Sequence, residues 1–242
     1  MPETGDILMF LLTVAWLLPL AGFVVEIYWL CFSHRLNKGA AYCAVACIGL
    51  GFLCSFSALM YWGTQTNWAA LSEPEHHGHD ASHDGGHGEG EHPQEANAAE
   101  AEHPGHTQSP AQTSTTTKKY FSGTYYELAR FGALRVSLDW YIDSLTLVMF
   151  TMVTFIATCI HIFAIGYMHD ELTEEYEDHE VHLHNGGHFS RPGRFHRFFA
   201  YLSLFSFSML GIVLAGNLFQ VFIFWELVGL SSYLLIGFYI ER

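Results

Sequence analysis

The chain has 242 residues, of which 50% are apolar, 16% are aromatic and only 14% are charged. Soluble domains carry about 25% charged residues, and their polar and apolar residues alternate at helical or strand spacing. Here most of the charge and 14 of the 16 histidines gather in two polar blocks, residues 73–119 and 169–197, between long apolar runs. This division excludes a soluble globular enzyme. The net charge of -14 argues against nucleic-acid binding, which requires a basic surface.

Five segments are apolar enough to cross a bilayer core, which takes about 20 helical residues. They are residues 7–32, 39–63, 140–168, 198–215 and 217–240. The first is preceded by the acidic residues Glu3 and Asp6 rather than by basic ones and stays apolar for about 26 residues, so we interpret it as a retained span and not a secretory signal. Pro19 lies inside this span, where neighbouring groups must satisfy the carbonyl that it frees. Gly216 and Asn217 form a tight turn, which predicts that the last two spans are antiparallel.

Basic residues in the short links predict the orientation of the spans. Arg35 and Lys38 lie in the first link, and Arg191, Arg194 and Arg197 end the third. Both links face the same side, because two spans separate them, and Lys and Arg in short loops mark the cytoplasmic side. We therefore expect a multi-pass membrane protein with its N-terminus and its long second link outside.

The two polar blocks and the segment between them complete the expected architecture. Residues 73–117 have almost no apolar content and should be disordered, and a short alternation from Leu134 to Trp140 predicts a strand of an external hairpin. The fold class that follows is an all-α membrane protein with five transmembrane helices, a small external β-hairpin and disordered histidine-rich loops. The expected parts are two helices (1–63), a disordered acidic external loop (64–119), the hairpin (120–139), the third helix (140–168), a histidine-rich cytoplasmic loop (169–197) and the last helix pair (198–242).

Glu226 is the most informative residue for function. It is the tenth residue of the last span, about 15 Å from its start, and so lies near the middle of a bilayer core about 30 Å thick. A carboxyl group at that depth costs at least about 2.5 kcal/mol unless it is paired or hydrated, and desolvation favours its protonated form. We expect it to bind and release a proton; the alternative is a protonated structural glutamate. The small residues Gly229, Ser231, Ser232 and Gly237 allow another helix or water to approach.

Other polar residues in the spans are weaker candidates. His161 of the third span is a candidate proton relay, or a structural donor to a neighbouring carbonyl. Asp139 and Asp143 lie near the outer end of that span, where capping or surface roles are expected. Glu26 lies two turns from the cytoplasmic end of the first span, and we expect its side chain to extend towards the basic link.

The histidine blocks raise the question of a metal site. His76, His77, His79 and His83 are the foremost candidates, and imidazole with carboxylate suits Zn, Ni or Cu. Their spacing is irregular and no regular element fixes a geometry, so a solvated acidic loop is the preferred interpretation. The five cysteines form no CxxC pair. The sequence also contains no GxGxxG, iron–sulfur or Walker motif.

Two runs are distinctive enough to indicate a family: RFFAYLSLF at 197–205 and NLFQVFIFWELVGLSSYLLIGFY at 217–239. YIDSLTLVM at 141–149, IHIFAIGYM at 160–168 and LLPLAGF at 17–23 are consistent with them. Together they closely resemble the antiporter-like membrane subunit L of bacterial NADH–quinone oxidoreductase (respiratory complex I). The resemblance touches every predicted helix except the second.

The resemblance implies a proton-translocating subunit in which Glu226 is the channel glutamate of the fifth helix, paired with a lysine two helices further on. It implies other complex I membrane subunits as partners, with NADH, FMN, the Fe–S clusters and quinone bound by partner subunits and no cofactor in this chain. Family members continue through further helices and a long lateral helix. We therefore expect a fragment, a truncated gene product or one piece of a split subunit.

Three other functions stay open at this point. An Mrp-type sodium/proton antiporter subunit, or a hydrogenase-linked relative, shares the glutamate motif. A non-pumping scaffold would brace neighbouring subunits and leave Glu226 without its cation. A metal-ion transporter would need ligands inside the membrane, where the helices offer one histidine, His161, and no HxxxD or HxxxE pair.

Overall fold

The computed structural model describes residues 4–32, 39–66, 68, 120–132, 134–173, 176–182 and 188–240. The chain divides into two compact units, one formed by residues 1–72 with 119–242 and one by residues 73–118. The second unit, which contains most of the loop expected to be disordered, lies outside the described residues. All the described helices and strands belong to the first unit.

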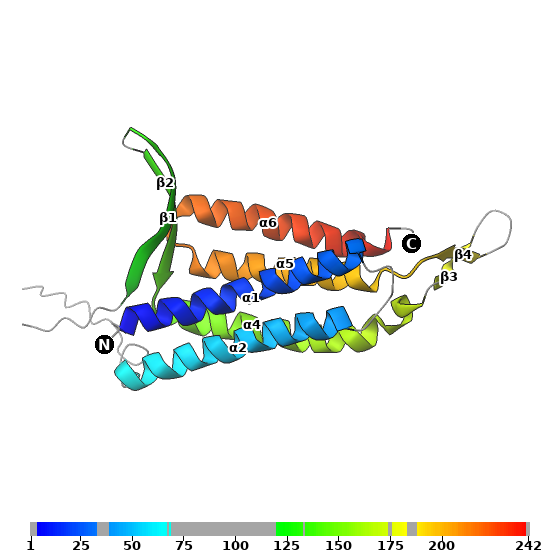
Figure 1. Cartoon of the computed structure of the whole chain (residues 1–242), viewed down its shortest axis with the longest axis horizontal. Coiled ribbons are helices and arrows are strands. Elements are labelled where there is room, and N and C mark those ends of the chain that lie inside the picture. Colours follow the sequence, from blue (N-terminus) through cyan, green and yellow to red (C-terminus); the bar gives the residue numbers. More distant parts are fainter. Residues whose placement is uncertain are drawn as a thin grey trace, which may run out of the picture. The chain divides into compact units, whose positions relative to one another are not determined.

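Five long helices make up this unit, and each contains a stretch long and apolar enough to cross a membrane. They are α1 (Thr4–Phe32), α2 (Gly39–Thr66), α4 (Ser144–Tyr167), α5 (Phe195–Leu214) and α6 (Leu218–Ile236). They lie side by side and alternate in direction (Figure 1). A helix satisfies its own backbone hydrogen bonds, which lipid cannot do. The predicted all-α membrane fold with five transmembrane helices is confirmed.

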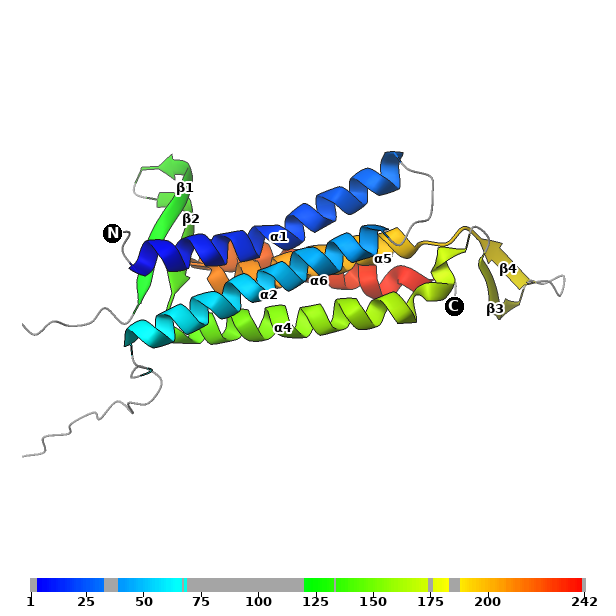
Figure 2. The same cartoon turned by 60° about the horizontal axis from the view of Figure 1, so that its bottom comes forward.

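The first four of these helices pack as a four-helix bundle, and the fifth lies against it. α1 and α4 each pack against both α2 and α5, whereas α6 packs against α5 (Figure 2). In consequence 56% of the α5 span is buried but only 17% of the α6 span. The helix that carries Glu226 is therefore the least covered of the five.

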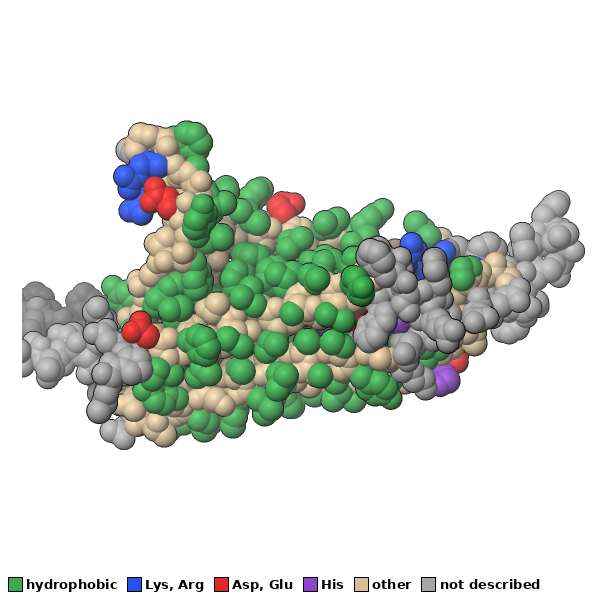
Figure 3. All heavy atoms as spheres, in the orientation of Figure 1, with side chains coloured by type: hydrophobic (Ala, Val, Ile, Leu, Met, Phe, Trp, Pro, Cys, Tyr) green, Lys and Arg blue, Asp and Glu red, His purple; other side chains and the backbone are tan. Residues whose placement is uncertain are grey.

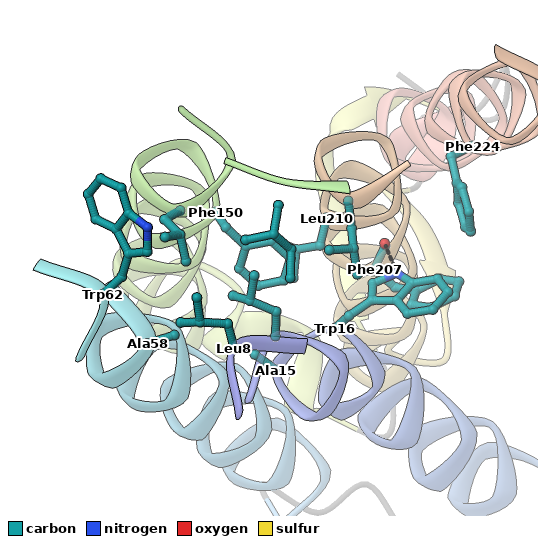
Figure 4. Packing of buried hydrophobic residues seen from close by; sticks show 13 residues of the cluster. Leu8, Ala15, Trp16, Ala58, Trp62, Phe150, Phe207, Leu210 and Phe224 are labelled. Carbon is teal, nitrogen blue, oxygen red and sulfur yellow. Dashed lines mark hydrogen bonds between the residues drawn. The ribbon is translucent and has the colours of Figure 1, made fainter. Parts of the chain in front are cut away.

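An aromatic group joins α1 to α5 and α6 in the main core (Figure 4). The rings of Trp16 and Phe207 are stacked, with centroids 5.2 Å apart and an angle of 10° between their planes. Phe224 of α6 meets both rings edge-on. A buried indole N–H needs a hydrogen-bond acceptor, and Trp16 Nε1 donates to the Phe207 carbonyl oxygen at 3.3 Å. This seam fixes α6 on the bundle.

Pro19 is accommodated by a close approach of α1 to α2. Proline removes one backbone hydrogen bond and bends the helix, and α1 changes direction along its length (Figure 2). The carbonyl that loses its usual donor belongs to Ala15, and Gly51 of α2 lies directly against it. A Cβ atom on Gly51 would be 3.2 Å from that oxygen.

A β-hairpin lies at the end of the bundle where α1 begins (Figure 1). Its strands β1 (Phe121–Phe131) and β2 (Leu134–Ile142) pair antiparallel, and Gly132 in the turn has a φ of +61°, which glycine adopts without strain. The predicted hairpin is confirmed. The third helix begins at Ser144 rather than at residue 140, because β2 continues through Ile142 and Asp143 then caps α4. The Asp143 carboxylate accepts from Thr146 N at 2.7 Å, as expected of a capping residue.

The link between α4 and α5 differs from the expected disordered loop. It contains the short helix η1 (His169–Leu172) and the antiparallel strands β3 (Tyr176–His182) and β4 (His188–Arg191). A buried ion pair ties the two ends of this link together. Two Arg191 nitrogens donate to the two Glu171 carboxylate oxygens at 2.7 and 2.8 Å, and both side chains are at least 96% buried. A bidentate contact of this kind holds both side chains in one geometry.

The tight α5–α6 contact gives a stability prediction. A Cβ atom at Gly211 would lie 2.5 Å from the Phe224 ring, so Gly211→Ala should push α6 off α5 and lower the melting temperature of the purified chain in detergent. Replacing glycine by alanine inside a helix otherwise gains about 1 kcal/mol. Gly49→Ala is the matched control, because no atom lies within 4 Å of that position, and it should melt at or above the parent temperature. Equal melting of both variants would contradict the close packing at Gly211.

Candidate functional site

Glu226 lies in the middle of α6. The helix is started by Asn217, whose side-chain Oδ1 accepts a hydrogen bond from Gln220 N at 2.8 Å. Glu226 is the ninth residue of α6, about 12 Å from its start, inside the stretch long enough to span a membrane. Its side chain is exposed and makes no hydrogen bond or ion pair with any residue that the structure describes.

The surface around Glu226 is apolar and uncovered. The neighbouring side chains Phe222, Trp225, Leu230 and Tyr233 are between 52% and 70% exposed, and the face of the bundle in Figure 3 is largely hydrophobic. Of the residues in α6 only Gln220, Phe224 and Ser231 are buried. An ionised carboxylate facing lipid is costly, so this face is stable in a membrane when protein or water covers the carboxyl group.

A small cavity of about 120 Å³ lies between the start of α5 and the end of α6. Arg194 and Arg197 line it from the start of α5, and Tyr233 lines it from α6. Tyr233 follows Glu226 by seven residues, so both lie on one face of α6, two turns apart. Basic and phenolic groups therefore stand at the end of the face that carries the carboxyl group.

The small residues near Glu226 take two different positions. Ser231 is fully buried and its hydroxyl donates to the carbonyl of Leu227 on its own helix at 2.8 Å. Gly229 is exposed, and no atom lies within 4 Å of the position that a Cβ would occupy. The open side of α6 thus has room for another element close to the carboxyl group.

His161 is buried on α4, with 1% of its surface exposed. Its Nδ1 lies 2.7 Å from the Ala157 carbonyl oxygen, and its ring packs near Phe199 of α5. Two turns earlier, Thr154 of α4 and Ser55 of α2 are joined by a hydrogen bond of 2.9 Å between their hydroxyls. His161 thus donates to a neighbouring carbonyl, which is the structural role expected as an alternative to a relay. The role of His161 as a proton relay stays a prediction. Its helix, α4, is not packed against α6.

The expectation for Glu26 was wrong. Its side chain does not extend towards the basic link but is completely buried, with 0% exposed. The Ser203 hydroxyl of α5 is its neighbouring polar group, and Cys47 of α2 lies nearby. Glu26 follows Gly22 by one turn, and residues four apart share one helix face. Gly22 packs against Cys47 of α2, so Glu26 also faces the interior of the bundle.

Asp139 joins the hairpin to the turn between α5 and α6. Its backbone N–H donates to Gln220 Oε1 at 3.0 Å, and its Oδ2 accepts from Asn217 Nδ2 and from Ser137 Oγ at 2.8 and 2.9 Å. Burial opposes the charge of this carboxyl, but the hydrogen bonds from Asn217 and from two hydroxyl side chains, together with nearby Arg135, hold its pKa below the ordinary value.

The metal candidates His76, His77, His79 and His83 lie outside the described residues, so metal binding by them stays a prediction. In the part of the chain that the structure describes, no three side chains of His, Cys, Asp or Glu converge as metal ligands.

Five membrane-length helices with a carboxyl group inside a span define a multi-pass membrane protein. Residues 128–176 match the family model described as NADH–ubiquinone oxidoreductase (complex I), chain 5 N-terminus. The chain is 39% identical over 122 residues to NADH–quinone oxidoreductase subunit L of Neisseria meningitidis serogroup A, which is 50% of this chain and 15% of that protein. It is 43% identical over 117 residues to NAD(P)H–quinone oxidoreductase chain 5 of Synechocystis (48% and 14%), and 41% identical over 114 residues to subunit L of Rhodobacter capsulatus (47% and 14%).

The chain thus spans 14–15% of the length of these relatives. It is related to the N-terminal part of NADH–quinone oxidoreductase subunit L, and the family resemblance found in the sequence is confirmed. The names of the relatives favour this family over the Mrp-type antiporter.

The low pKa of Asp139 predicts acid sensitivity of the hairpin junction. A carboxyl whose pKa is lower in the folded protein stabilises it above the ordinary value of about 3.9, and this contribution is lost as the pH falls through the folded pKa. Asp139→Asn should therefore melt earlier than the parent at neutral pH and lose less stability on acidification. Melting curves over a pH series test this, with the exposed Asp170→Asn as a control that follows the parent. Identical pH profiles for parent and Asp139→Asn would show that the junction does not depend on the charge.

Proposed function

We propose that this chain is the N-terminal part of a membrane subunit through which NADH–quinone oxidoreductase couples electron transfer to proton translocation. The observation that carries the proposal is Glu226, a carboxyl group in the middle of a span on an uncovered face of α6. The names of the relatives, which are subunits of quinone oxidoreductases, support it. NADH, FMN, Fe–S clusters and quinone are, in this proposal, bound by partner subunits.

The proposed chemistry is the loading and release of a proton on Glu226. In a site shielded from water, the neutral acid is favoured while no cation is close, and a cation that approaches within about 4–6 Å favours the carboxylate and releases the proton. The uncovered face of α6 is the side from which further helices of the subunit would bring such a cation. Redox reactions elsewhere in the complex would move it.

The cavity beside α6 supports a route for protons towards Glu226. Arg194, Arg197 and Tyr233 line it at the end of the bundle where the α4–α5 link lies.

Short links rich in Lys and Arg favour the cytoplasm, so we propose that the end of the bundle with the α4–α5 link faces the cytoplasm of a bacterial cell and that the N-terminus lies outside.

Replacing Glu226 in the assembled complex tests its role. Glu226→Gln keeps the shape and a hydrogen-bonding carbonyl but cannot ionise, so proton pumping coupled to NADH–quinone turnover should fall sharply while the complex still assembles. Glu226→Asp should retain part of the pumping, because the acid remains at a shorter reach. The measurements are quinone reduction and proton uptake in membrane vesicles, with a blue-native gel to establish assembly.

Glu127→Gln is the matched control for this experiment, since Glu127 lies on the hairpin, outside the spans, and is paired with Arg130 and Arg135. It should pump like the parent. If Glu226→Gln also assembles and pumps like the parent, Glu226 is a structural carboxyl and the chain is a non-pumping scaffold.

Cysteine labelling tests the proposed orientation. In a chain whose five cysteines have been replaced, Ser122→Cys on β1 should react with a membrane-impermeant maleimide in intact cells. Thr173→Cys, in the α4–α5 link, should react only after the inner face is opened. Both positions are exposed, so the opposite pattern of labelling would reverse the orientation.

A further inference from the structure

A second carboxyl group inside a membrane span, that of Glu26, has no role in the proposed function. It lies six residues before Phe32, the end of α1, and therefore about 9 Å inside the helix. Its side chain is 0% exposed, and neither of its oxygens has a hydrogen-bond partner among the described residues. An ionised carboxylate buried without a partner is strongly disfavoured. The neutral acid is the form that this site accommodates.

Among the described residues, the helices packed against Glu26 offer it no cation. α2 presents Cys43 and Cys47, and this helix contains no Asp, Glu, Lys, Arg or His. α5 presents Ser203, which is 1% exposed and whose hydroxyl also lacks a hydrogen-bond partner among the described residues. Apart from its tyrosine, α5 has two ionisable side chains, His196 and Arg197, and both lie in its first turn.

A hydroxyl is well suited to serve both states of a carboxyl group. The Ser203 hydroxyl can donate a hydrogen bond to a carboxylate or accept one from a carboxylic acid, because rotation about one bond reorients its proton. Ser203 is the polar side chain that interacts with Glu26 from α5. The pair therefore forms a site at which a proton can arrive or leave without a change in packing.

Of the two ends of the bundle, the one where α1 ends and α5 begins is nearer to Glu26 (Figure 2). His196 precedes Ser203 by seven residues, so the two lie on the same face of α5, and His196 stands at the end of the helix. Phe199 and Ala200, both buried, lie between them on that face, so the reason to place proton exchange at this end is distance: Glu26 lies about 9 Å from the end of α1. In the other direction the stacked rings of Trp16 and Phe207 fill the interior (Figure 4), and Leu12 of α1 is fully buried.

We propose that Glu26 is a second proton-binding group of the bundle, and that its proton exchanges with water at the end where α5 begins. The ligand is a hydrogen ion, held between the Glu26 carboxyl group and the Ser203 hydroxyl. This inference does not depend on the proposed function, because Glu26 is enclosed by α2 and α5 and does not lie on the open face of α6.

Infrared spectroscopy of the full chain in lipid vesicles tests the proposal. A protonated carboxylic acid has a carbonyl band that is separate from the carboxylate bands, and this band shifts when the acid proton is replaced by deuterium. The parent chain should show such a band at neutral pH, and it should shift after transfer to heavy water. Glu226 has no cation in these vesicles and contributes a band of its own if it is protonated, so the variants are made in the Glu226→Gln chain. There Glu26→Gln should remove the remaining band, Ser203→Ala should change its frequency, and Glu127→Gln should leave it in place.

Two results would overturn the proposal. A band that survives in the chain carrying both Glu26→Gln and Glu226→Gln means that Glu26 is not the protonated group. If Glu26→Gln removes the band but heavy water does not shift it, the Glu26 proton does not exchange with water. It is then a trapped structural proton. Should Glu26→Gln fail to fold, Glu26→Asp serves for the assignment, because it keeps the acid and should move the band; an unmoved band would then exclude Glu26.

Discussion

Inside a bilayer core no water competes for polar groups, so a carboxyl group in a membrane span must find its partner within protein or bind a proton. The two glutamates within the membrane-length stretches, Glu26 and Glu226, meet this constraint differently. Glu26 is enclosed by α1, α2 and α5 beside a single hydroxyl, whereas Glu226 stands on the open side of α6. The first site is complete within the described bundle, and the second needs an element on its open face.

The bundle can hold these groups in place because its helices approach closely at a few positions. Gly51 lets α2 lie against the α1 carbonyl freed by Pro19, and Gly211 makes room for the Phe224 ring. Between them, the stacked rings of Trp16 and Phe207 join α1 to α5. Close packing of this kind takes the place of the hydrophobic effect, which does not drive helices together in lipid.

Polar contacts at the two ends of the bundle fix its connections. At one end Asp139 and Asn217 join the hairpin to the α5–α6 turn through short hydrogen bonds. At the other end Glu171 and Arg191 close the histidine-rich link with a buried ion pair. Removing ions from water is costly, and only good geometry and further hydrogen bonds offset that cost. Arg194 N supplies one such bond, donating to Glu171 at 3.0 Å.

The amino-acid sequence by itself determined the five spans, their alternation, the hairpin and the depth of Glu226, because hydropathy, residue spacing and helix rise are properties of contiguous segments. It also indicated the resemblance to the N-terminal part of subunit L, since the runs at 197–205 and 217–239 are distinctive. Only the tertiary structure decided that Glu26 is buried, that Asp139 is a junction residue and that Glu171 pairs with Arg191. The physical reason is the same in each case: the environment of a side chain is set by residues far away in the chain, such as Ser203 for Glu26 and Asn217 for Asp139, and local patterns do not say which of them meet.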